Sequence, residues 1–569
     1  MIFKETKVRK LFIFMIVVGI SLASFAEAQE KKIYWGSEVP AGWNGGWEEI
    51  LKTPVEKTDF ARTATNQDIL EFFATLKWKS ENVHVFNMFV SDLGRSCPVI
   101  VMANPRVTSA REARSSGKTI VYLQGGIHPS ECEGKEAMLM LMRDILFGEK
   151  KYWLDNLIIL SCPNFNLDGN EILSVDDGLP KLSGRRQNAQ GYDVNRDAIK
   201  LETTNMQAAY QNLFNTWDPI IVHDTHRMGG ARHGYAIVQA ASNVTTAHPG
   251  PRGYVTEKIF PALRNMTREN GGIEIHFHAG LDRGWPPTEF THDNSIWSTE
   301  GKFMVSGYGL RNRMSILVET PGYESFEKKI YSQYVYMREL MEYSYQHGEE
   351  MQQVCRQADE EVVSEIQTKA EKGQLKNFVE GIYESYGKFD IYAYQTIPSE
   401  IIPGTSVRQR QIINEPPELV PNVELVTKPV GTKEAMVPRG YLIPADMEFI
   451  VEKLRIHNIK IIILEKPITV SGEEFIVDKL VPVRKGGYNM TSLEGGFFKS
   501  KRKEFPAGTF QIDLAQPLAN MAFYCLEPQI GDGFVGWNLL NNYLKDLGAE
   551  KHSIVYPIYK YLKIIEEKN

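Results

Sequence analysis

The stretch Thr119-Ile-Val-Tyr-Leu-Gln-Gly-Gly-Ile-His-Pro-Ser-Glu131 is the most informative segment for the fold of the first half of the chain. Its aliphatic and aromatic run predicts a short buried strand, the glycine pair predicts a tight turn, and residues 133–147 predict a helix directly after it. A strand, a turn and a helix in this order are typical of an α/β unit. His128 and Glu131 lie in the turn, and both residue types are zinc ligands.

Further short apolar runs repeat this pattern along the chain. They are aliphatic or β-branched, are bounded by polar residues, Gly or Pro, and cover residues 157–160, 219–222 and 314–318. Helices are expected at 203–215 and 325–350. This alternation over about residues 60–345 predicts an α/β fold, with a mixed, largely parallel buried sheet flanked by helices.

Polar residues follow two of these strands. The third run ends in Val222-His-Asp-Thr-His226, which offers His223 and His226 as a third zinc ligand, and the strand pattern leaves both open. The fourth run leads into Glu319, a carboxylate whose partial burial would raise its pKa toward that of a general base. Open α/β sheets bind ligands at the carboxyl ends of their strands, so we expect these side chains to meet there.

A dense polar segment, residues 185–197, lies between the second and third strands. It holds Arg185, Arg186 and Arg196. The planar guanidinium group matches a carboxylate and supplies a fixed positive charge to a developing oxyanion. The segment therefore favours substrate binding, with an ordinary solvated loop as the alternative.

In this order, these segments resemble the zinc carboxypeptidases of the M14 (carboxypeptidase A) class. The resemblance covers about residues 60–345 and rests on a set of motifs, namely His128-Pro-Ser-Glu131, Pro163-Asn-Phe-Asn-Leu-Asp-Gly169, Gly191-Tyr-Asp-Val-Asn-Arg196, Asp224-Thr-His226 and Leu317-Val-Glu319-Thr. In the second motif, Leu167 replaces the proline of the family. The class uses a His₂Glu catalytic zinc site.

The resemblance implies a metal site and a base. One Zn²⁺ would be bound by His128, Glu131 and His226, which favours His226 over His223. Asp193 would orient His128. Glu319 would act as the general base toward a zinc-activated water and then protonate the leaving amine.

The resemblance also implies substrate-binding residues. Asn195 and Arg196 would bind the terminal carboxylate of the substrate, and Arg186, with Arg185 as its rival, would stabilise the oxyanion. The substrate-capping tyrosine of the family falls near Trp297 here, so we name Tyr308, in Ser306-Gly-Tyr-Gly, as the candidate.

Residues 1–28 have the pattern of an export signal. Basic residues precede an apolar run of about 15 residues, and Ala26-Glu27-Ala28 supplies the small residues of a cleavage site. The run is shorter than the ~20 residues that a membrane span needs. We therefore expect export to the periplasm or the extracellular space, and no membrane span after signal removal.

The rest of the chain divides by composition. We expect a catalytic domain at 29–348, a charged helix and proline-rich linker at 349–429, and a C-terminal α+β or β-rich module of unknown role at 430–569. The net charge of −7 without a long basic block argues against nucleic-acid binding, and five scattered cysteines argue against a disulfide framework. The pattern specifies no oligomeric state.

The leading hypothesis is an exported zinc metallocarboxypeptidase that acts on peptides with a free C-terminal carboxylate. One alternative is a zinc amidohydrolase that acts on N-acyl amino acids or peptidoglycan stem peptides. Another is a non-catalytic binding protein on the same fold. The candidate metal ligands, general base and substrate-binding arginine are all present, including Arg196 and Glu319. This complete set argues against a non-catalytic binding protein.

Overall fold

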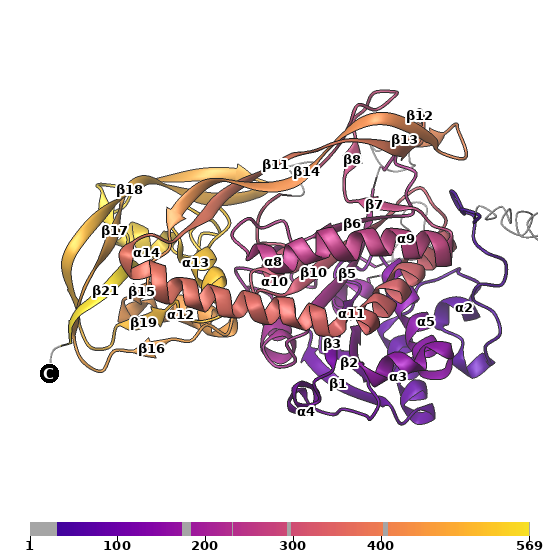
Figure 1. Cartoon of the computed structure of the whole chain (residues 1–569), viewed down its shortest axis with the longest axis horizontal. Helices are drawn as coiled ribbons and strands as arrows, with labels where there is room; N and C mark the ends of the chain where they lie inside the picture. The colour runs from indigo at the N-terminus through magenta and orange to yellow at the C-terminus, as the bar shows by residue number, and fades with distance from the viewer. Residues whose placement is uncertain (1–30, 173–183, 230, 293–297, 402–407, 568–569) are drawn as a thin grey trace, which may run out of the picture. The chain divides into compact units, whose positions relative to one another are not determined.

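A mixed sheet of eight strands lies at the centre of the first half of the chain (Figure 1). The computed structural model describes residues 31–172, 184–229, 231–292, 298–401 and 408–567. In spatial order the strands are β1 (Val83–Val90), β2 (Ser96–Met102), β4 (Leu157–Cys162), β3 (Thr119–Gln124), β5 (Ile221–Met228), β10 (Met314–Pro321), β6 (Ile237–Ala241) and β7 (Ile275–Phe277). The four middle strands, β4, β3, β5 and β10, are parallel to one another.

Strand alternation supplies two hydrophobic cores. In β3, Val121 and Leu123 belong to one core, whereas Ile120 and Tyr122 belong to the other. The first core includes residues of α2 (Pro54–Lys57), α3 (Asn66–Lys79), α5 (Glu133–Phe147), α8 (Pro249–Tyr254), α9 (Phe260–Gly271) and α11 (Phe326–Lys369). The second includes residues of α4 (Ala110–Ser115), α6 (Leu167–Asn170), α7 (Thr204–Ala209) and α10 (Met304–Gly309). The predicted α/β architecture is confirmed.

Helix α11 extends well beyond the expected residue 350. It runs unbroken for 44 residues to Lys369, and its second half buries a row at heptad-like spacing that includes Met351, Cys355, Val362 and Ile366. Most charged side chains of this half are exposed, whereas Asp359 pairs with Arg313 at 3.0 Å. The apolar row therefore makes it a packed helix and not a solvated one.

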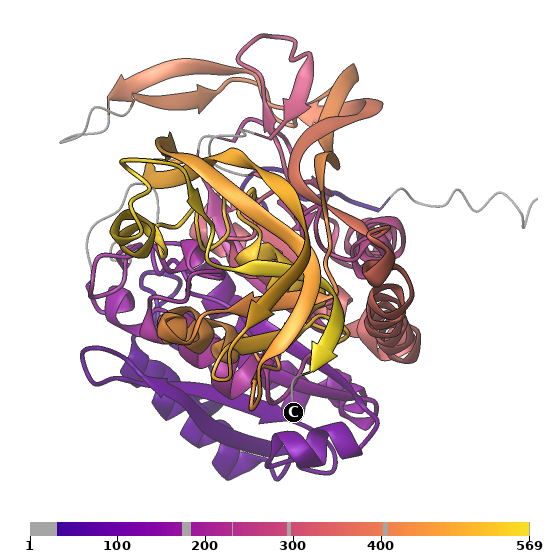
Figure 2. The same cartoon turned by 90° about the vertical axis from the view of Figure 1, so that its left-hand side faces the viewer.

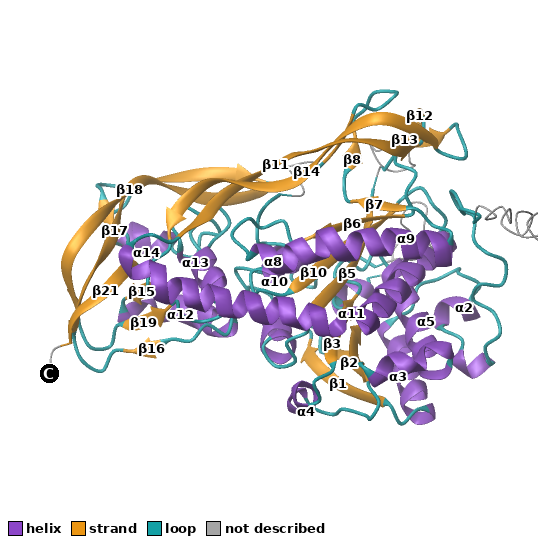
Figure 3. Cartoon of the chain, in the orientation of Figure 1, coloured by secondary structure: helices purple, strands orange, loops and turns teal. Residues whose placement is uncertain are grey.

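The expected proline-rich linker is replaced by strands. β11 (Lys376–Ala393) and β14 (Glu418–Met436) form a long antiparallel pair and continue into β9 (Glu289–Thr291) and β8 (Gly280–Leu281) (Figure 3). β12 (Thr396–Ile401) and β13 (Arg408–Ile412) form a second, separate pair. Alternating buried residues such as Val423 and Leu425 hold β14 in place, a pattern that the flanking prolines concealed.

The C-terminal region is a sheet of seven strands with three helices, which confirms the expected strand-rich module (Figure 2). Its elements are β15 (Gly440–Ile443), α12 (Glu448–Ile456), β16 (Ile462–Ile463), β17 (Ile468–Lys485), β18 (Tyr488–Phe505), β19 (Phe510–Asp513), α13 (Ala519–Leu526), α14 (Asn541–Asp546), β20 (Ile554–Val555) and β21 (Tyr559–Glu567). β17 and β18 pair as a hairpin whose turn contains Gly486 and Gly487, both at positive φ.

This module shares a core with the first domain. Tyr441 and Phe523 of the module belong to the same hydrophobic cluster as Tyr210 and Phe303. Residues 34–569 accordingly form one compact unit, without a break at the expected boundary near residue 430. The expected export signal, residues 1–28, lies outside the described residues. Among those that are described, we find no helix with the length and hydrophobicity that crossing a bilayer requires.

Two module residues hold the backbone just before α10. The Tyr524 hydroxyl accepts a hydrogen bond from Gly301 N at 2.7 Å, and Asp532 Oδ2 accepts one from Lys302 N at 2.7 Å. Burial, with the charge of Glu300 nearby, raises the pKa of Asp532 from 3.8 to about 7. The protonated carboxyl group is therefore favoured by the folded state.

We expect Asp532→Asn to reduce the pH dependence of stability. A folded-state pKa above the unfolded value contributes stability that is complete below about pH 4 and is lost as the pH rises through about 7. Between pH 5 and pH 8, the melting temperature of the wild type should fall by a few degrees relative to the variant, which mimics the protonated group. Thermal denaturation at both pH values measures this. Asp546→Asn, at an exposed position of α14, is the control, and parallel curves for all three proteins would contradict the assignment.

Candidate metal centre

The turn after β3 is shaped by its glycines. Gly126 has φ +66°, and a Cβ there would lie 2.8 Å from Asn164 Oδ1, so the turn requires glycine at this position. The chain then reverses, with Glu131 N donating to His128 O at 2.9 Å. Since α5 begins at Glu133, both His128 and Glu131 are held between a strand end and a helix start.

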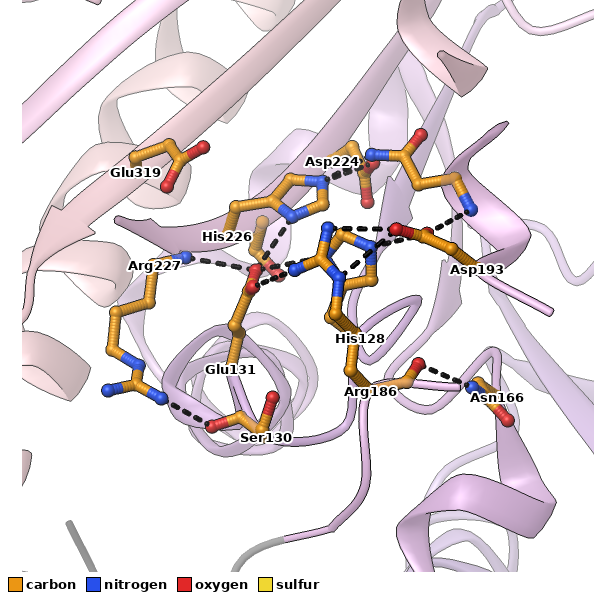
Figure 4. A network of polar contacts seen from close by, with 12 residues as sticks. His128, Ser130, Glu131, Asn166, Arg186, Asp193, Asp224, His226, Arg227 and Glu319 are labelled. Carbon is orange, nitrogen blue, oxygen red and sulfur yellow. Dashed lines mark hydrogen bonds and ion pairs between the residues drawn. The ribbon is translucent and has the colours of Figure 1, made fainter. Parts of the chain in front are cut away.

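His128, Glu131 and His226 converge on one point (Figure 4). Glu131 Oε2 lies 3.2 Å from His128 Nδ1 and 2.8 Å from His226 Nδ1. All three side chains are buried, and one ligand atom from each lies within 4.8 Å of the others. His226 reaches this point from β5, two strand positions after Asp224.

A carboxylate lies behind each imidazole. Asp193 Oδ1 is 2.9 Å from His128 Nε2, and Asp224 Oδ2 is 2.8 Å from His226 Nε2. Each ring thus presents Nδ1 to the centre while its other nitrogen faces an acceptor, which is the arrangement of metal-ligating histidines. Burial raises the pKa of Asp193, but His128 and the neighbouring arginines outweigh this and hold it well below its usual value.

His223 is excluded from the centre by strand geometry. It lies three residues before His226, so the two face opposite sides of β5. His223 is fully buried against Tyr336, with ring centroids 5.4 Å apart, and burial lowers its pKa to about 3. It is a core histidine.

Arg186 bridges the carboxylates of the centre. Its Nη1 donates to Glu131 Oε1 at 2.9 Å, and its Nε donates to Asp193 Oδ2 at 3.1 Å. Burial lowers the pKa of Arg186, but these two carboxylates outweigh it and the pKa is raised. Arg185 contacts Gln187 at the exposed surface instead. Of the two rivals, only Arg186 lines the cavity over the centre.

Arg196 and Asn195 lie at one end of the same cavity, in the short turn Val194–Arg196. The Arg196 guanidinium stacks 4.6 Å from the ring centroid of Phe303 and donates to Asn195 O at 2.9 Å. Asn195 Oδ1 accepts from Met304 N at 2.9 Å. This segment before α10 is the one that Tyr524 and Asp532 hold, so the C-terminal module supports the arginine indirectly.

Glu319 lines the cavity from β10, beside His226 in the strand register. The cavity has a volume of about 610 Å³. His278 faces Glu319, with Nε2 3.5 Å from Oε1, and its Nδ1 lies 3.1 Å from Nδ1 of His292. A carboxylate, a three-residue metal cluster and two arginines therefore share one concave site.

Part of the chain matches a known family, and more of it aligns with known proteins. Residues 69–229 match the zinc carboxypeptidase family, peptidase M14. This region of the chain therefore resembles a zinc carboxypeptidase domain. Carboxypeptidase 2 of Trichophyton rubrum is 24% identical over 476 residues, 79% of each chain, and that of Trichophyton tonsurans is 23% identical over 479 residues, again 79% of each. A solved structure, a putative carboxypeptidase A of Shewanella denitrificans, is 14% identical with a TM-score of 0.36, over 49% of this chain and 69% of that one.

The prediction for Tyr308 is wrong. Tyr308 is fully buried in α10, and its hydroxyl donates to Pro219 O. Burial raises its pKa well above the ordinary value. Its ring packs against Phe214 at 4.7 Å, so it belongs to the core and not to the cavity. Trp297, the alternative position, lies outside the described residues.

Tyr308→Phe should therefore destabilise the enzyme by about 1 kcal/mol without changing KM for peptides, because the lost hydrogen bond lies in the core. Chemical denaturation and steady-state kinetics on the same preparation test this. An unchanged unfolding midpoint together with a tenfold rise in KM would instead indicate that Tyr308 binds the substrate.

Several residues of the site were not predicted from the sequence. Asp224 had a usable signal, since strand alternation places it on the same side as His226. No such sequence signal marks His278, His292 and Phe303, because no periodic pattern connects them to the motifs. They come from loops and short elements that the fold brings to the cavity.

Proposed function

We propose that this protein is an exported zinc carboxypeptidase that hydrolyses the C-terminal peptide bond of peptides, with Glu319 as the general base. The pair of carboxylates behind the two histidines carries the proposal. A neutral imidazole ligates through one nitrogen, and a carboxylate on the other nitrogen fixes its orientation and raises its basicity. The distances of 2.9 Å from Asp193 to His128 and 2.8 Å from Asp224 to His226 support this role.

The donor set fits zinc. Two imidazole nitrogens and one carboxylate oxygen are the ligand types of a catalytic His₂Glu site, which leaves a position open for the reaction. Glu131 keeps its charge for this purpose, because His128 and His226 outweigh burial and hold its pKa well below the ordinary value. When bound, zinc supplies a Lewis acid that activates water and polarises the scissile carbonyl.

The remaining residues of the site each have a separate role in the proposed reaction. Glu319 takes a proton from the attacking water and passes it to the leaving amine. Arg186, at the edge of the centre, donates to the developing oxyanion. Arg196 binds the C-terminal carboxylate of the substrate, for which its stacking on Phe303 holds the guanidinium plane in place. Asn195 supports this end of the cavity.

The proposal of export rests on residues 1–28 alone, through the basic start, the apolar run and the small residues at the cleavage site. N-terminal analysis of the protein expressed with its full leader tests it. A mature chain beginning at Gln29 supports export, and a retained Met1 would contradict it.

Substrate competition tests the proposed reaction. The zinc-loaded enzyme is given a peptide, an N-acyl amino acid and a peptidoglycan stem peptide in parallel, and the products are separated. We expect release of the C-terminal residue from the peptide. Preferred deacylation or stem-peptide cleavage would instead indicate the amidohydrolase, and binding without turnover would indicate the non-catalytic protein.

A further inference from the structure

A second cavity of about 230 Å³, which we call the side chamber, adjoins the cavity of the metal centre. Its wall includes Arg252, Thr427 and Lys428, and it shares His278 and His292 with the main cavity. Since His278 Nε2 lies 3.5 Å from Glu319 Oε1, the side chamber begins one imidazole ring away from the proposed base.

Arg252, from α8, is a half-buried cation that forms no ion pair among the described residues. Its Nη1 is buried and has no hydrogen-bond partner within that part of the chain. Burial lowers its pKa, and Tyr386 is the neighbour whose charge acts in the opposite direction. Burying an unpaired charge costs free energy, so we expect the Arg252 guanidinium to bind an anionic ligand.

Other groups that line the side chamber also favour an anionic ligand. Thr427 Oγ1 is buried and also lacks a partner among the described residues, and Lys428 adds a second positive charge. Glu257 is the one acidic residue among those described in the wall, which leaves the lining cationic. A guanidinium fork, a hydroxyl and an ammonium group together suit a carboxylate.

The size and the apolar part of the wall restrict the ligand further. Whole small-molecule ligands occupy pockets of roughly 300–1,000 Å³, so the side chamber suits one side chain rather than a second ligand. Phe260 and Phe277 line it beside the polar groups. A short apolar stem that ends in a carboxylate fits this combination.

We propose that the side chamber is a subsite for the carboxylate side chain of the substrate's C-terminal residue, so that the enzyme prefers peptides ending in glutamate or aspartate. The inference rests on the proposed carboxypeptidase function. The main-chain carboxylate binds Arg196, and the side-chain carboxylate passes the two histidines to reach Arg252. The stem of the side chain lies against the phenylalanine rings.

Three matched peptides test this with the zinc-loaded enzyme. One ends in glutamate, one ends in glutamine, and one ends in glutamine with glutamate as the residue before it. We expect kcat/KM for the first to exceed that for the second by at least about tenfold, and no gain for the third. Arg252→Gln should abolish the preference, whereas Lys258→Gln, at an exposed position outside the chamber, should keep it.

Thr427→Val removes the buried hydroxyl with little change of volume and should reduce the preference for glutamate severalfold. This variant tests the proposal if Arg252→Gln does not fold. Equal rates for glutamate and glutamine in the wild type, a preference that follows the penultimate residue, or a preference that survives in a folded Arg252→Gln would each overturn the proposal. No release of a C-terminal residue from any peptide would instead reject the proposed function itself.

Discussion

Glu319→Gln should lower kcat by about 10²–10⁴-fold while the protein still binds one zinc ion. The amide has the shape of the carboxylate and leaves His278 with an acceptor, but it cannot take a proton from water. Glu319 belongs to β10 and not to the three-residue metal cluster, so the metal content should not change. Activity assays and metal analysis of the same sample separate the two effects.

Glu350→Gln is the matched control, because Glu350 is exposed on α11, away from the cavity. It should retain full activity. Peptidase activity that is unchanged in Glu319→Gln would remove the general base from the mechanism. Loss of zinc from that variant would instead show that the carboxylate acts as a ligand.

Arg196→Ala should weaken cleavage of peptides with a free C-terminus by about 10–100-fold in kcat/KM, because a hydrogen bond to a charged group contributes about 1.5–3 kcal/mol. C-terminally amidated peptides lack the charge, so their slow cleavage should change little. The ratio of the two rates is therefore the informative quantity, since it cancels any general effect on folding or zinc binding.

Arg185→Ala serves as the control from the same segment. Its guanidinium contacts Gln187 at the surface, outside the cavity. It should leave both rates unchanged. Equal losses on free and amidated peptides in Arg196→Ala would contradict its assignment to the substrate carboxylate.

Local sequence patterns were enough for the parts of the site that lie at strand ends. The strand at Thr119–Gln124, the glycine turn and the helix that begins at Glu133 are contiguous, so their periodicity and turn chemistry place His128 and Glu131 directly. His226 and Glu319 follow buried strands, and the parallel pairing of β5 and β10 brings them together.

Features that depend on long-range contacts could not be predicted from local sequence patterns. Tyr308 has a suitable residue type, but spacing along the chain does not show that α10 buries it. The segment before α10 is held by Tyr524 and Asp532, which are more than two hundred residues away. The proline-rich region also gave no sign that β11 and β14 would pair, because a strand's partner is not encoded in its own composition.

Mass spectrometry of a mixed peptide library tests the zinc-dependent carboxypeptidase reaction most directly, when it is run on metal-depleted enzyme before and after addition of zinc. We predict products shortened one residue at a time from the C-terminus, formed only after zinc is restored, with N-termini and internal bonds intact. Internal cleavage, removal of N-acyl groups, or the same products without zinc would contradict the reaction that His128, Glu131, His226 and Glu319 are proposed to perform.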